Sequence, residues 1–337
     1  MKVYELNQNE GLDALTQGER EVPEVGPDDV RVLVRAVSLN FRDLGIARLR
    51  RKPGARPLIP TSDGAGEVVE VGRNVRSLKV GDRVAASFFP SWHAGAPIAA
   101  YHANALGGSV DGMLAEQVVL PQASWVRLPE HLSFEEGATL PCAGVTAFNA
   151  LFESASVRPG DTILLQGTGG VSIFALQLAK AAGARVIITS SHADKRVRAA
   201  KLGADHTLDY KATPKWGEEA TSLTGGRGVD VVVEVGGPGT FDQSVAALRY
   251  GGTMSILGVL TGTRGEVNTY GIFHKALRVH GVYVGSVAMF ESLNRVLTAH
   301  AIHPVVDRVF GFDEARAAYE YLASAQHFGK VVIRVGS

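Results

Sequence analysis

The feature that most constrains the fold is a strand, a glycine-rich turn and a helix between residues 162 and 182. The apolar run Thr162–Gln166 leads directly into Gly167-Thr168-Gly169-Gly170-Val171-Ser172. Apolar residues then recur at helical spacing, and Gly183 ends the helix just before a second apolar run, Arg185–Thr189. Because parallel strands need a crossover connection of this kind, the segment predicts a βαβ unit in a parallel sheet.

Strand and helix patterns continue to alternate as far as residue 285, which predicts a doubly wound, parallel-sheet α/β domain over residues 126–285. Further strands are predicted at His206–Asp209, Asp230–Val235, Thr253–Leu257 and Arg278–Val284, and helices at Val171–Ala182, Asp194–Leu202 and Phe241–Arg249. Near the start of this domain, Ser133 and Glu136 form a capping box, and the helix that follows runs to Phe152 with a break at Pro141.

The first 125 residues are rich in predicted strands and turns. Strands are expected at Val30–Leu39, Gly64–Val71, Arg83–Ala86 and Leu114–Leu120, with one short helix at Arg42–Arg50. This pattern favours a compact, partly open β-barrel. The tail supplies a helix, Asp313–Ala323, and a strand, Lys330–Val335, and we expect residues 286–337 to return to the first domain.

Charge and cysteine content exclude several classes of protein. The chain has 34 Lys and Arg residues and 34 Asp and Glu residues, so no net positive field attracts nucleic acid or an anionic membrane. Cys142 is the only cysteine, which excludes an internal disulfide and a multi-cysteine metal site. The sequence contains neither a signal-peptide pattern at its start nor an apolar run long enough to span a bilayer. We therefore expect a cytoplasmic protein.

The glycine-rich turn has the context of a dinucleotide-binding fingerprint. Gly167 permits the tight turn, Gly169 lets the backbone approach a pyrophosphate, and Thr168, Gly170 and Val171 complete the start of the helix. Ser172 stands where the fingerprint has Gly or Ala, and it is small enough for close packing of helix on strand. The alternative interpretation is a tight β–α connection without a ligand.

The end of the second strand indicates which dinucleotide binds. An Asp or Glu there would accept from the ribose 2′-hydroxyl of NAD, but the sequence has Ser190 and Ser191, with Lys195 soon after. Two hydroxyls and a cation suit a 2′-phosphate, so the sequence favours NADPH over NADH. Alternatively, Ser191 or Asp194 only caps the next helix. Tyr210 follows the third strand and is a further candidate to contact the adenosine end.

Five segments together resemble the medium-chain dehydrogenase/reductase superfamily, and above all its zinc-free quinone oxidoreductase and enoyl reductase branches. The segments are Asn40–Asp43, Ser62–Val68, Gly81–Val84, Leu140–Ala147 and Gly167–Ser172. The resemblance covers essentially the whole chain. It implies a GroES-like catalytic domain, a Rossmann domain, substrate bound in the cleft between them, and a homodimer joined at the strand near Arg278–Val284.

The resemblance also bears on metal content. Zinc-dependent relatives have a Cys, a His followed by Glu, and a second Cys, whereas the matching positions here are Asn40, Ser62-Asp63 and Cys142. One thiolate cannot hold a catalytic zinc that takes about three protein ligands. We therefore expect no zinc, and we interpret His93 and His102 as loop residues rather than metal ligands.

Several site residues follow from the resemblance alone. Asn40 is the candidate donor to a developing oxyanion, Asp43 either lines the site or orients Arg42 or a backbone turn, and Thr146 contacts the nicotinamide or packs in its helix. Phe41 stands where some enoyl reductases have a proton-donating tyrosine. The loop Ser87–Ser109, with Phe88, Trp92, Tyr101 and His102, is expected at the rim of the substrate cleft. Backbone groups of Gly258, Val259, Leu260, Tyr283 and Val284 would hold the carboxamide, and Lys330 either reaches cofactor phosphate or only begins a strand.

These observations predict an NADPH-dependent, zinc-independent oxidoreductase that transfers hydride to a quinone or an α,β-unsaturated carbonyl compound. Two alternatives stay open: a zinc-free enzyme of the alcohol dehydrogenase type, and a nucleotide-binding relative without turnover. The expected partners are a small-molecule substrate and a second copy of the chain, with no nucleic acid and no membrane.

Overall fold

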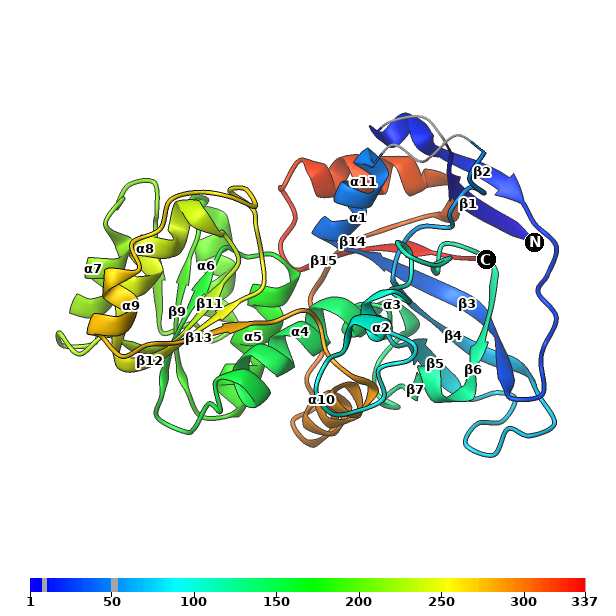
Figure 1. The fold of residues 1–337 in the computed structure, drawn as a ribbon, viewed down its shortest axis with the longest axis horizontal. Coiled ribbons are helices and arrows are strands. Elements are labelled where there is room, and N and C mark those ends of the chain that lie inside the picture. The colour runs from blue at the N-terminus through cyan, green and yellow to red at the C-terminus, as the bar shows by residue number, and fades with distance from the viewer. Residues whose placement is uncertain (8–10, 50–53, 337) are drawn as a thin grey trace. The chain divides into compact units, whose positions relative to one another are not determined.

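The structure is a computed structural model that describes residues 1–7, 11–49 and 54–336. The chain forms two compact units, one of Met1–Val145 with Val284–Ser337 and the other of Thr146–Tyr283 (Figure 1). We expected the boundaries after residues 125 and 285. Residues 126–145 instead belong to the first unit, because helix α3 (Phe134–Gly137) packs on that unit's strands β3 and β4.

The second unit is a parallel sheet with the strand order β10-β9-β8-β11-β12-β13. Its strands are β8 (Thr162–Gln166), β9 (Arg185–Thr189), β10 (His206–Leu208), β11 (Val229–Glu234), β12 (Leu248–Ile256) and β13 (Arg278–Gly281). The strand order reverses direction between β8 and β11, and ligands of such sheets bind at the carboxyl ends of the strands at this point. The predicted doubly wound sheet is confirmed.

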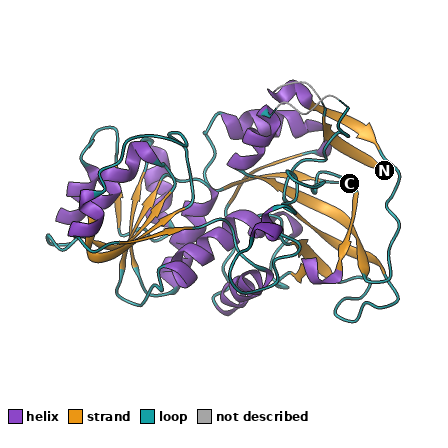
Figure 2. Cartoon of the chain, viewed as in Figure 1, coloured by secondary structure: helices purple, strands orange, loops and turns teal. Residues whose placement is uncertain are grey.

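Helices cover both faces of this sheet, as the purple ribbons on either side of the orange strands show (Figure 2). They are α5 (Gly170–Ala181), α6 (Ala193–Lys201), α7 (Trp216–Ser222), α8 (Pro238–Ala247) and α9 (Tyr270–His274). Strands β8 and β11 are buried over their whole length, which explains the apolar runs Ile163–Leu165 and Val231–Val233 within them. Helices α7 and α9 were not predicted, because each is too short to show a helical repeat of apolar residues.

The first unit is built around a seven-stranded sheet with the order β14-β15-β3-β4-β5-β7, in which β6 also pairs with β3. Its strands are β3 (Asp29–Leu39), β4 (Asp63–Val71), β5 (Arg83–Ala86), β6 (Gln117–Pro121), β7 (Trp125–Arg127), β14 (Val306–Phe310) and β15 (Lys330–Arg334), beside a hairpin of β1 (Lys2–Leu6) and β2 (Leu15–Glu19). The tail therefore returns as predicted: β15, red in Figure 1, pairs with β3, which is blue. The predicted β-rich first domain, to which the tail returns, is confirmed.

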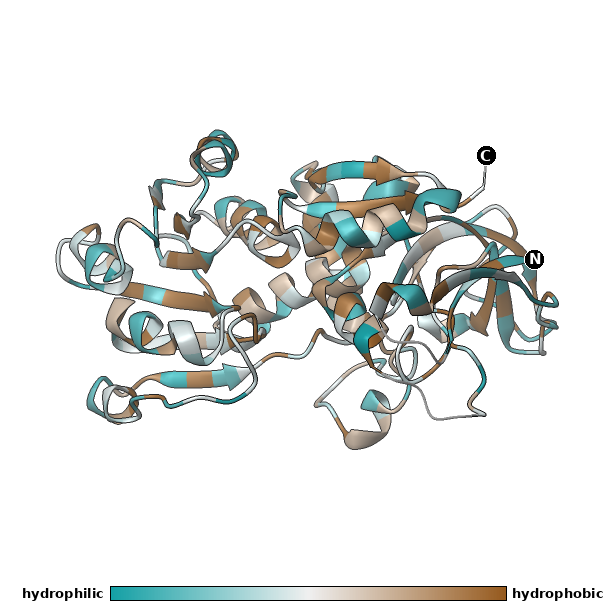
Figure 3. Cartoon of the chain, turned by 90° about the horizontal axis from the view of Figure 1, so that it is seen from above, coloured by the Kyte–Doolittle hydropathy of each residue, from teal (hydrophilic) through white to brown (hydrophobic). Residues whose placement is uncertain are grey.

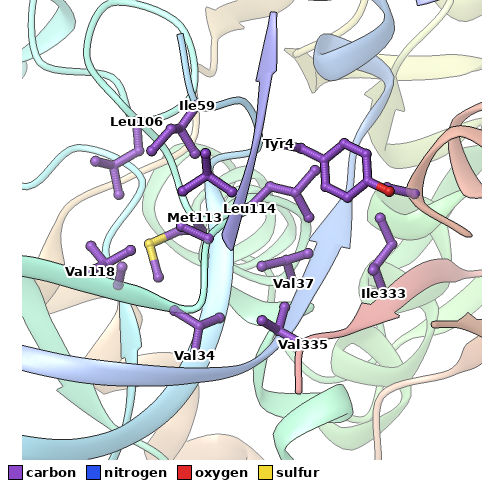
Figure 4. Packing of buried hydrophobic residues seen from close by; sticks show 14 of the residues in the cluster. Tyr4, Val34, Val37, Ile59, Leu106, Met113, Leu114, Val118, Ile333 and Val335 are labelled. Atoms are coloured by element: carbon purple, nitrogen blue, oxygen red, sulfur yellow. The ribbon is translucent and has the colours of Figure 1, made fainter. Parts of the chain in front are cut away.

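Apolar side chains from distant parts of the first unit meet in one core. Tyr4, Val34, Met113 and Ile333 all belong to it (Figure 4), and brown hydrophobic bands mark the strands that carry such residues (Figure 3). The helices of this unit are α1 (Phe41–Arg48), α2 (Ala99–His102), α3, α10 (Val287–Ala299) and α11 (Ala315–Ala323). Helix α10 and strand β14 were missed by the sequence analysis, and Arg50, the predicted end of α1, lies outside the described residues.

The segment around Pro141 is helical but irregular. Ser133 caps α3 through its side chain and forms the predicted capping box with Glu136. A π-helical turn, Leu140–Gly144, contains Pro141, and α4 (Val145–Phe148) follows it. The predicted interruption is present, but it lies at Ala138-Thr139, just before Pro141. Pro141 stands in the first turn of the next helical segment, where its missing N–H is tolerated. Among the residues that the structure describes, no helix is long and apolar enough to cross a membrane.

Candidate cofactor and catalytic sites

The glycine-rich turn lies at the carboxyl end of β8 and opens helix α5. Gly167 has a left-handed φ of +68°, a conformation that costs little only for glycine. The Ser172 hydroxyl donates to the Gln166 carbonyl oxygen at 2.7 Å, so this serine ties the helix to the strand. The departure from the fingerprint at Ser172 is therefore compatible with close packing.

Gly169 is not required by the protein's own packing. Its backbone is extended, and none of the described atoms lies within 4 Å of the position that a Cβ would take. Any residue could therefore occupy this position unless a ligand comes close to the backbone there. Since the first turn of α5 presents N–H groups at the same place, the turn fits a dinucleotide pyrophosphate.

Polar groups gather at the end of β9. Ser190 is buried, and its hydroxyl oxygen accepts the backbone N–H of His192 at 3.3 Å. Arg196 donates to the Ser190 carbonyl oxygen at 2.7 Å and to Asp209 at 2.9 Å. Asp209 was missed by the sequence analysis because it lies on the adjacent strand's end, nineteen residues from Ser190 along the chain. The group next to the predicted 2′-phosphate site is therefore a carboxylate already paired with an arginine.

Glu234, at the end of β11, anchors the loop beside the glycine-rich turn. It is fully buried. One carboxylate oxygen accepts the N–H groups of Gly236 and Gly237 at 2.7 and 2.9 Å, and the other accepts from the Gln166 amide at 2.6 Å. The Ser244 hydroxyl donates to it as well. The sequence signal for this anchor is an acidic residue at the end of a buried strand, just before Gly236-Gly237.

The remaining predicted cofactor residues divide between the two units. The second unit contains Thr146, Thr168, Lys195 and Tyr210, together with Gly258–Leu260 after β12 and Tyr283 at its end; Val284 and Lys330 belong to the first unit. Val284 has a φ of +55°, which is strained for a β-branched residue and costs about 1–3 kcal/mol. Such strain is concentrated at functional sites in proteins, and Val284 stays a predicted site residue.

In the first unit, a buried polar cluster lies where β15, β3 and β4 end side by side. The Lys330 ammonium donates to the Leu39 carbonyl oxygen at 2.7 Å and to Asn40 Oδ1 at 2.6 Å. Its Nζ is also 4.0 Å from a carboxylate oxygen of Asp63. All three side chains are at least nine-tenths buried. Lys330 is thus an internal cation in this structure, a placement that the sequence did not predict.

Asp63 also connects this cluster to the backbone of Cys142. Asp63 accepts the Ser62 hydroxyl at 2.7 Å and the backbone N–H of Cys142 at 3.2 Å. Burial raises the pKa of Asp63, while Lys330 and hydrogen bonding by Asn40, Ser62 and Cys142 oppose that rise. Burial, together with the Asp63 charge, also raises the pKa of the Cys142 thiol well above its ordinary value.

This set of side chains does not fit a catalytic zinc ion. Cys142 is the only thiol in the sequence, whereas a catalytic zinc takes about three protein ligands. An ammonium 2.6 Å from Asn40 Oδ1 would also repel a dication held by Asn40 and Asp63. Within the described ranges, no group of three or more His, Cys, Asp or Glu side chains has an arrangement that could hold a metal ion.

Asp43 holds the backbone of Asn40 through a hydrogen bond. Its carboxylate accepts the backbone N–H of Asn40 at 2.7 Å, and Asp43 is fully buried at the start of α1. Burial raises its pKa from 3.8 to about 7, with Arg42 opposing the rise. Its second carboxylate oxygen makes no hydrogen bond with any described residue. In this structure Asp43 therefore orients a backbone turn, the second of the two roles that we considered for it.

The aromatic loop after β5 is internally packed. Trp92 stacks with Tyr101, and Phe89 stacks with His102, at ring-centroid distances of 6.0 and 5.2 Å. The Arg42 guanidinium lies 4.7 Å from the centre of the Phe88 ring. The carbonyl oxygens of Trp92 and His93 accept the first N–H groups of α10, from Val287 and Ala288, at 2.9 Å. The loop thus holds the start of α10, and its place at a substrate rim stays a prediction.

Two family profiles match the chain in order along the sequence. An alcohol dehydrogenase GroES-like domain matches residues 26–130, and a zinc-binding dehydrogenase domain matches residues 170–299. A zinc-type alcohol dehydrogenase-like protein of Schizosaccharomyces pombe is 45% identical to this chain over 333 residues, with 96% of each protein covered.

Solved structures agree over the full length. A putative alcohol dehydrogenase from Sinorhizobium meliloti 1021 has a TM-score of 0.92 and 39% identity, covering 99% of this chain and 98% of its own. The quinone oxidoreductase from Coxiella burnetii has a TM-score of 0.82 and 26% identity, covering 100% of this chain and 99% of its own. The two units described above therefore occur together in other proteins.

Proposed function

The chain belongs to the medium-chain dehydrogenase/reductase superfamily of oxidoreductases, and from this premise we propose that it is an NADPH-dependent, zinc-independent reductase. Its proposed acceptors are quinones and α,β-unsaturated carbonyl compounds. NADPH, when bound, supplies a hydride, and a proton from water completes the two-electron reduction. The observation that carries the proposal is the Lys330 ammonium beside Asn40 and Asp63, where zinc-dependent relatives have a metal shell.

The chemistry of the acceptor follows from the lack of a suitable metal shell. Simple alcohols and ketones need strong polarisation of their oxygen, which a zinc ion supplies. A quinone or an enone is already activated by conjugation, so hydrogen-bond donors are enough to stabilise the charge that develops on oxygen. The similarity to a quinone oxidoreductase supports this choice, although the S. pombe relative carries a zinc-type alcohol dehydrogenase-like name.

We assign roles to the residues accordingly. Asn40 donates to the acceptor oxygen, and Asp43 holds the Asn40 backbone in place. The pyrophosphate is held by the turn Gly167–Val171, and the nicotinamide end by Thr146, Gly258–Leu260 and Tyr283-Val284. The open space at Gly169 supports the first of these assignments.

The preference for NADPH rests on the end of β9. Ser190, Ser191 and Lys195 supply two hydroxyls and a cation there. The carboxylate nearby, Asp209, is neutralised by Arg196 at 2.9 Å, so it offers less repulsion to a 2′-phosphate than an unpaired carboxylate would.

Turnover tests the proposal directly. We would follow NADPH oxidation with 1,4-benzoquinone and 2-cyclohexenone, and NADP⁺ reduction with a panel of simple alcohols. Reduction of either acceptor supports the proposal, and Gly169→Val should abolish it because a branched side chain would fill the pyrophosphate position. Activity with alcohols alone would favour an alcohol dehydrogenase, and tight NADPH binding without turnover would favour a nucleotide-binding protein.

Two binding experiments separate the cofactor and metal claims. Titration calorimetry with 2′,5′-ADP and 5′-AMP compares affinity for the 2′-phosphate without requiring turnover. The double variant Ser190→Asp/Lys195→Ala should weaken 2′,5′-ADP far more than 5′-AMP, and equal losses would contradict the NADPH assignment. Exhaustive dialysis against a chelator should leave activity intact, whereas a loss that zinc restores would contradict zinc independence.

We also propose that the protein is a homodimer joined along β13. This strand ends the sheet of the second unit, and all four of its residues are exposed. An exposed strand edge pairs readily with another strand, and Tyr270 and Phe273 on α9, more than half exposed, add apolar surface near it. Sedimentation equilibrium should give a dimer for the protein and a monomer for Val279→Lys/Phe273→Ser; a wild-type monomer would contradict the proposal.

A further inference from the structure

The register of the first unit's sheet brings Lys330 to Asn40. Strand β15 runs antiparallel to β3 with Val331 opposite Leu39, so Lys330 stands opposite Asn40. On the other side of β3, Ser38 is opposite Asp63. Three adjacent strands thus end with a cation, an amide and a carboxylate. Because strand pairing fixes this arrangement, it does not depend on the packing of one long side chain.

The ammonium determines how the Asn40 amide is turned. A lysine Nζ has only N–H donors, so the amide atom 2.6 Å from it must be the oxygen, Oδ1. Nδ2 then lies on the opposite side of the planar group. It is buried, and its hydrogen bonding contributes to lowering the pKa of Asp63. It makes no hydrogen bond of normal geometry with any described residue, so at least one of its two N–H groups has no acceptor. A buried donor left in this state is costly unless a ligand or water accepts from it.

Building on the proposed function, we propose that Lys330 is a positioning residue: it fixes and polarises the Asn40 amide, and Asn40 Nδ2 donates to the acceptor's carbonyl oxygen. The hydride brings two electrons to the conjugated carbon, the π electrons move to the oxygen, and the Nδ2 N–H group stabilises the resulting negative charge. A proton from water then completes the product. NADPH is oxidised and the quinone or enone is reduced.

Two physical effects make this pairing stronger than an isolated asparagine. The ammonium holds the amide in one of its two orientations, so no free energy is spent on orienting the donor during the reaction. A charge-assisted hydrogen bond to Oδ1 also polarises the amide and strengthens its N–H donors. One buried positive charge thereby takes over part of the electrostatic role of a metal ion, without needing a thiolate from Cys142.

Two other roles for Lys330 give different results in solution. A contact with cofactor phosphate, as the family resemblance implied, would make Lys330 variants bind NADPH more weakly. A purely structural role, in which the ammonium only neutralises Asp63 and satisfies the Leu39 carbonyl, would reduce stability without reducing the turnover number of the folded protein.

The test compares Lys330→Met, Lys330→Arg, Asn40→Ala and the double variant Asn40→Ala/Lys330→Met, with 1,4-benzoquinone at saturating NADPH. Loss of an oxyanion donor lowers kcat by about 100-fold or more, so we expect that loss for Asn40→Ala and at least about 10-fold for Lys330→Met. Lys330→Arg, which also has only donors, should recover most of kcat. The double variant should be no worse than Asn40→Ala alone, because the two residues act as one unit.

Lys275→Met serves as the matched control. Lys275 is also a partly buried ammonium, and it donates to three backbone carbonyl oxygens, those of Val245, Ala246 and Leu248, in the second unit. Its loss should reduce stability while kcat is unchanged. Multiplying effects in the double variant, or a large change in NADPH affinity with kcat unchanged in Lys330→Met, would overturn the proposal.

A measurement on the unliganded protein distinguishes failure of this inference from failure of the proposed function. The chain has eight asparagines, and the side-chain amide signals of Asn40 in a ¹⁵N-asparagine-labelled sample are those that Asn40→Ala removes. They should shift in Lys330→Met and return toward wild type in Lys330→Arg. Unchanged signals would refute the pairing itself, whereas the expected shifts without turnover on any acceptor would refute only the proposed function.

Discussion

Replacement of Asp43 by asparagine gives a quantitative test of the buried cluster. Burial raises the Asp43 pKa to about 7, with the nearby Asp63 charge adding to the rise and Arg42 and Lys330 opposing it. Burial, and to a lesser extent the Asp43 charge, also raises the pKa of the Tyr319 hydroxyl. Because the folded protein binds this proton more tightly than the unfolded chain, the contribution of Asp43 to stability is complete at acid pH and is lost as the pH rises toward 7.

The magnitude follows from the width of that window. The unfolded carboxyl has a pKa near 3.8 and the folded one near 7, and each pH unit between them corresponds to about 1.4 kcal/mol. The folded carboxyl is half ionised by pH 7, so from pH 5 to pH 7 the first unit should lose about 2 kcal/mol of unfolding free energy through Asp43. In Asp43→Asn the amide oxygen can still accept the Asn40 N–H but does not titrate, so the variant should gain this amount relative to wild type over the same interval.

Urea unfolding followed by tryptophan fluorescence measures the effect in the correct unit. Two of the three tryptophans, Trp92 and Trp125, are buried in the first unit, and Trp216 lies in the second. Both proteins should therefore carry Trp216→Phe. Asp63 is present in both, so its own titration largely cancels in the comparison. Unfolding free energies that run parallel from pH 5 to pH 7 would refute the reasoning about Asp43.

Three further predictions concern stability. The effect of burial is outweighed by hydrogen bonds from Arg227 and other donors, which hold the pKa of Asp230 below its ordinary value. The second unit should therefore lose stability as the pH falls below about 4. Asp230→Asn should remove this loss, as measured by the fluorescence of Trp216, and an unchanged acid transition would contradict the prediction. Lys275→Met should lower the unfolding free energy of the second unit by about 2 kcal/mol because a charged donor is lost from three carbonyl oxygens; an unchanged urea midpoint would show those bonds to be unimportant. Thr61 is β-branched with a φ of +66°, so Thr61→Gly should stabilise the first unit by about 1 kcal/mol, and a lower melting temperature would mean that the threonine side chain compensates for its strain.

Strong local patterns were enough to predict most of the fold. The turn Gly167–Ser172, with a strand before it and an amphipathic helix after it, predicted the order of elements in the second unit, because a two-residue or 3.6-residue repeat is visible in the sequence itself. Helix α7 has few apolar residues, so it shows no helical repeat. Strand β14 is short and does not alternate apolar and polar residues, so it gave no comparable signal either.

The sequence by itself indicated a dinucleotide-type turn, and it has Asn40 and Ser62-Asp63 at positions where the family resemblance places zinc ligands. Only the tertiary structure decided what stands beside them. Lys330 and Asn40 are 290 residues apart along the chain, and their contact depends on the pairing of β15 with β3. Sequence spacing carries no information about such a contact, because strand register is fixed by burial of one face of the sheet and by the chain's return, not by local residue preferences.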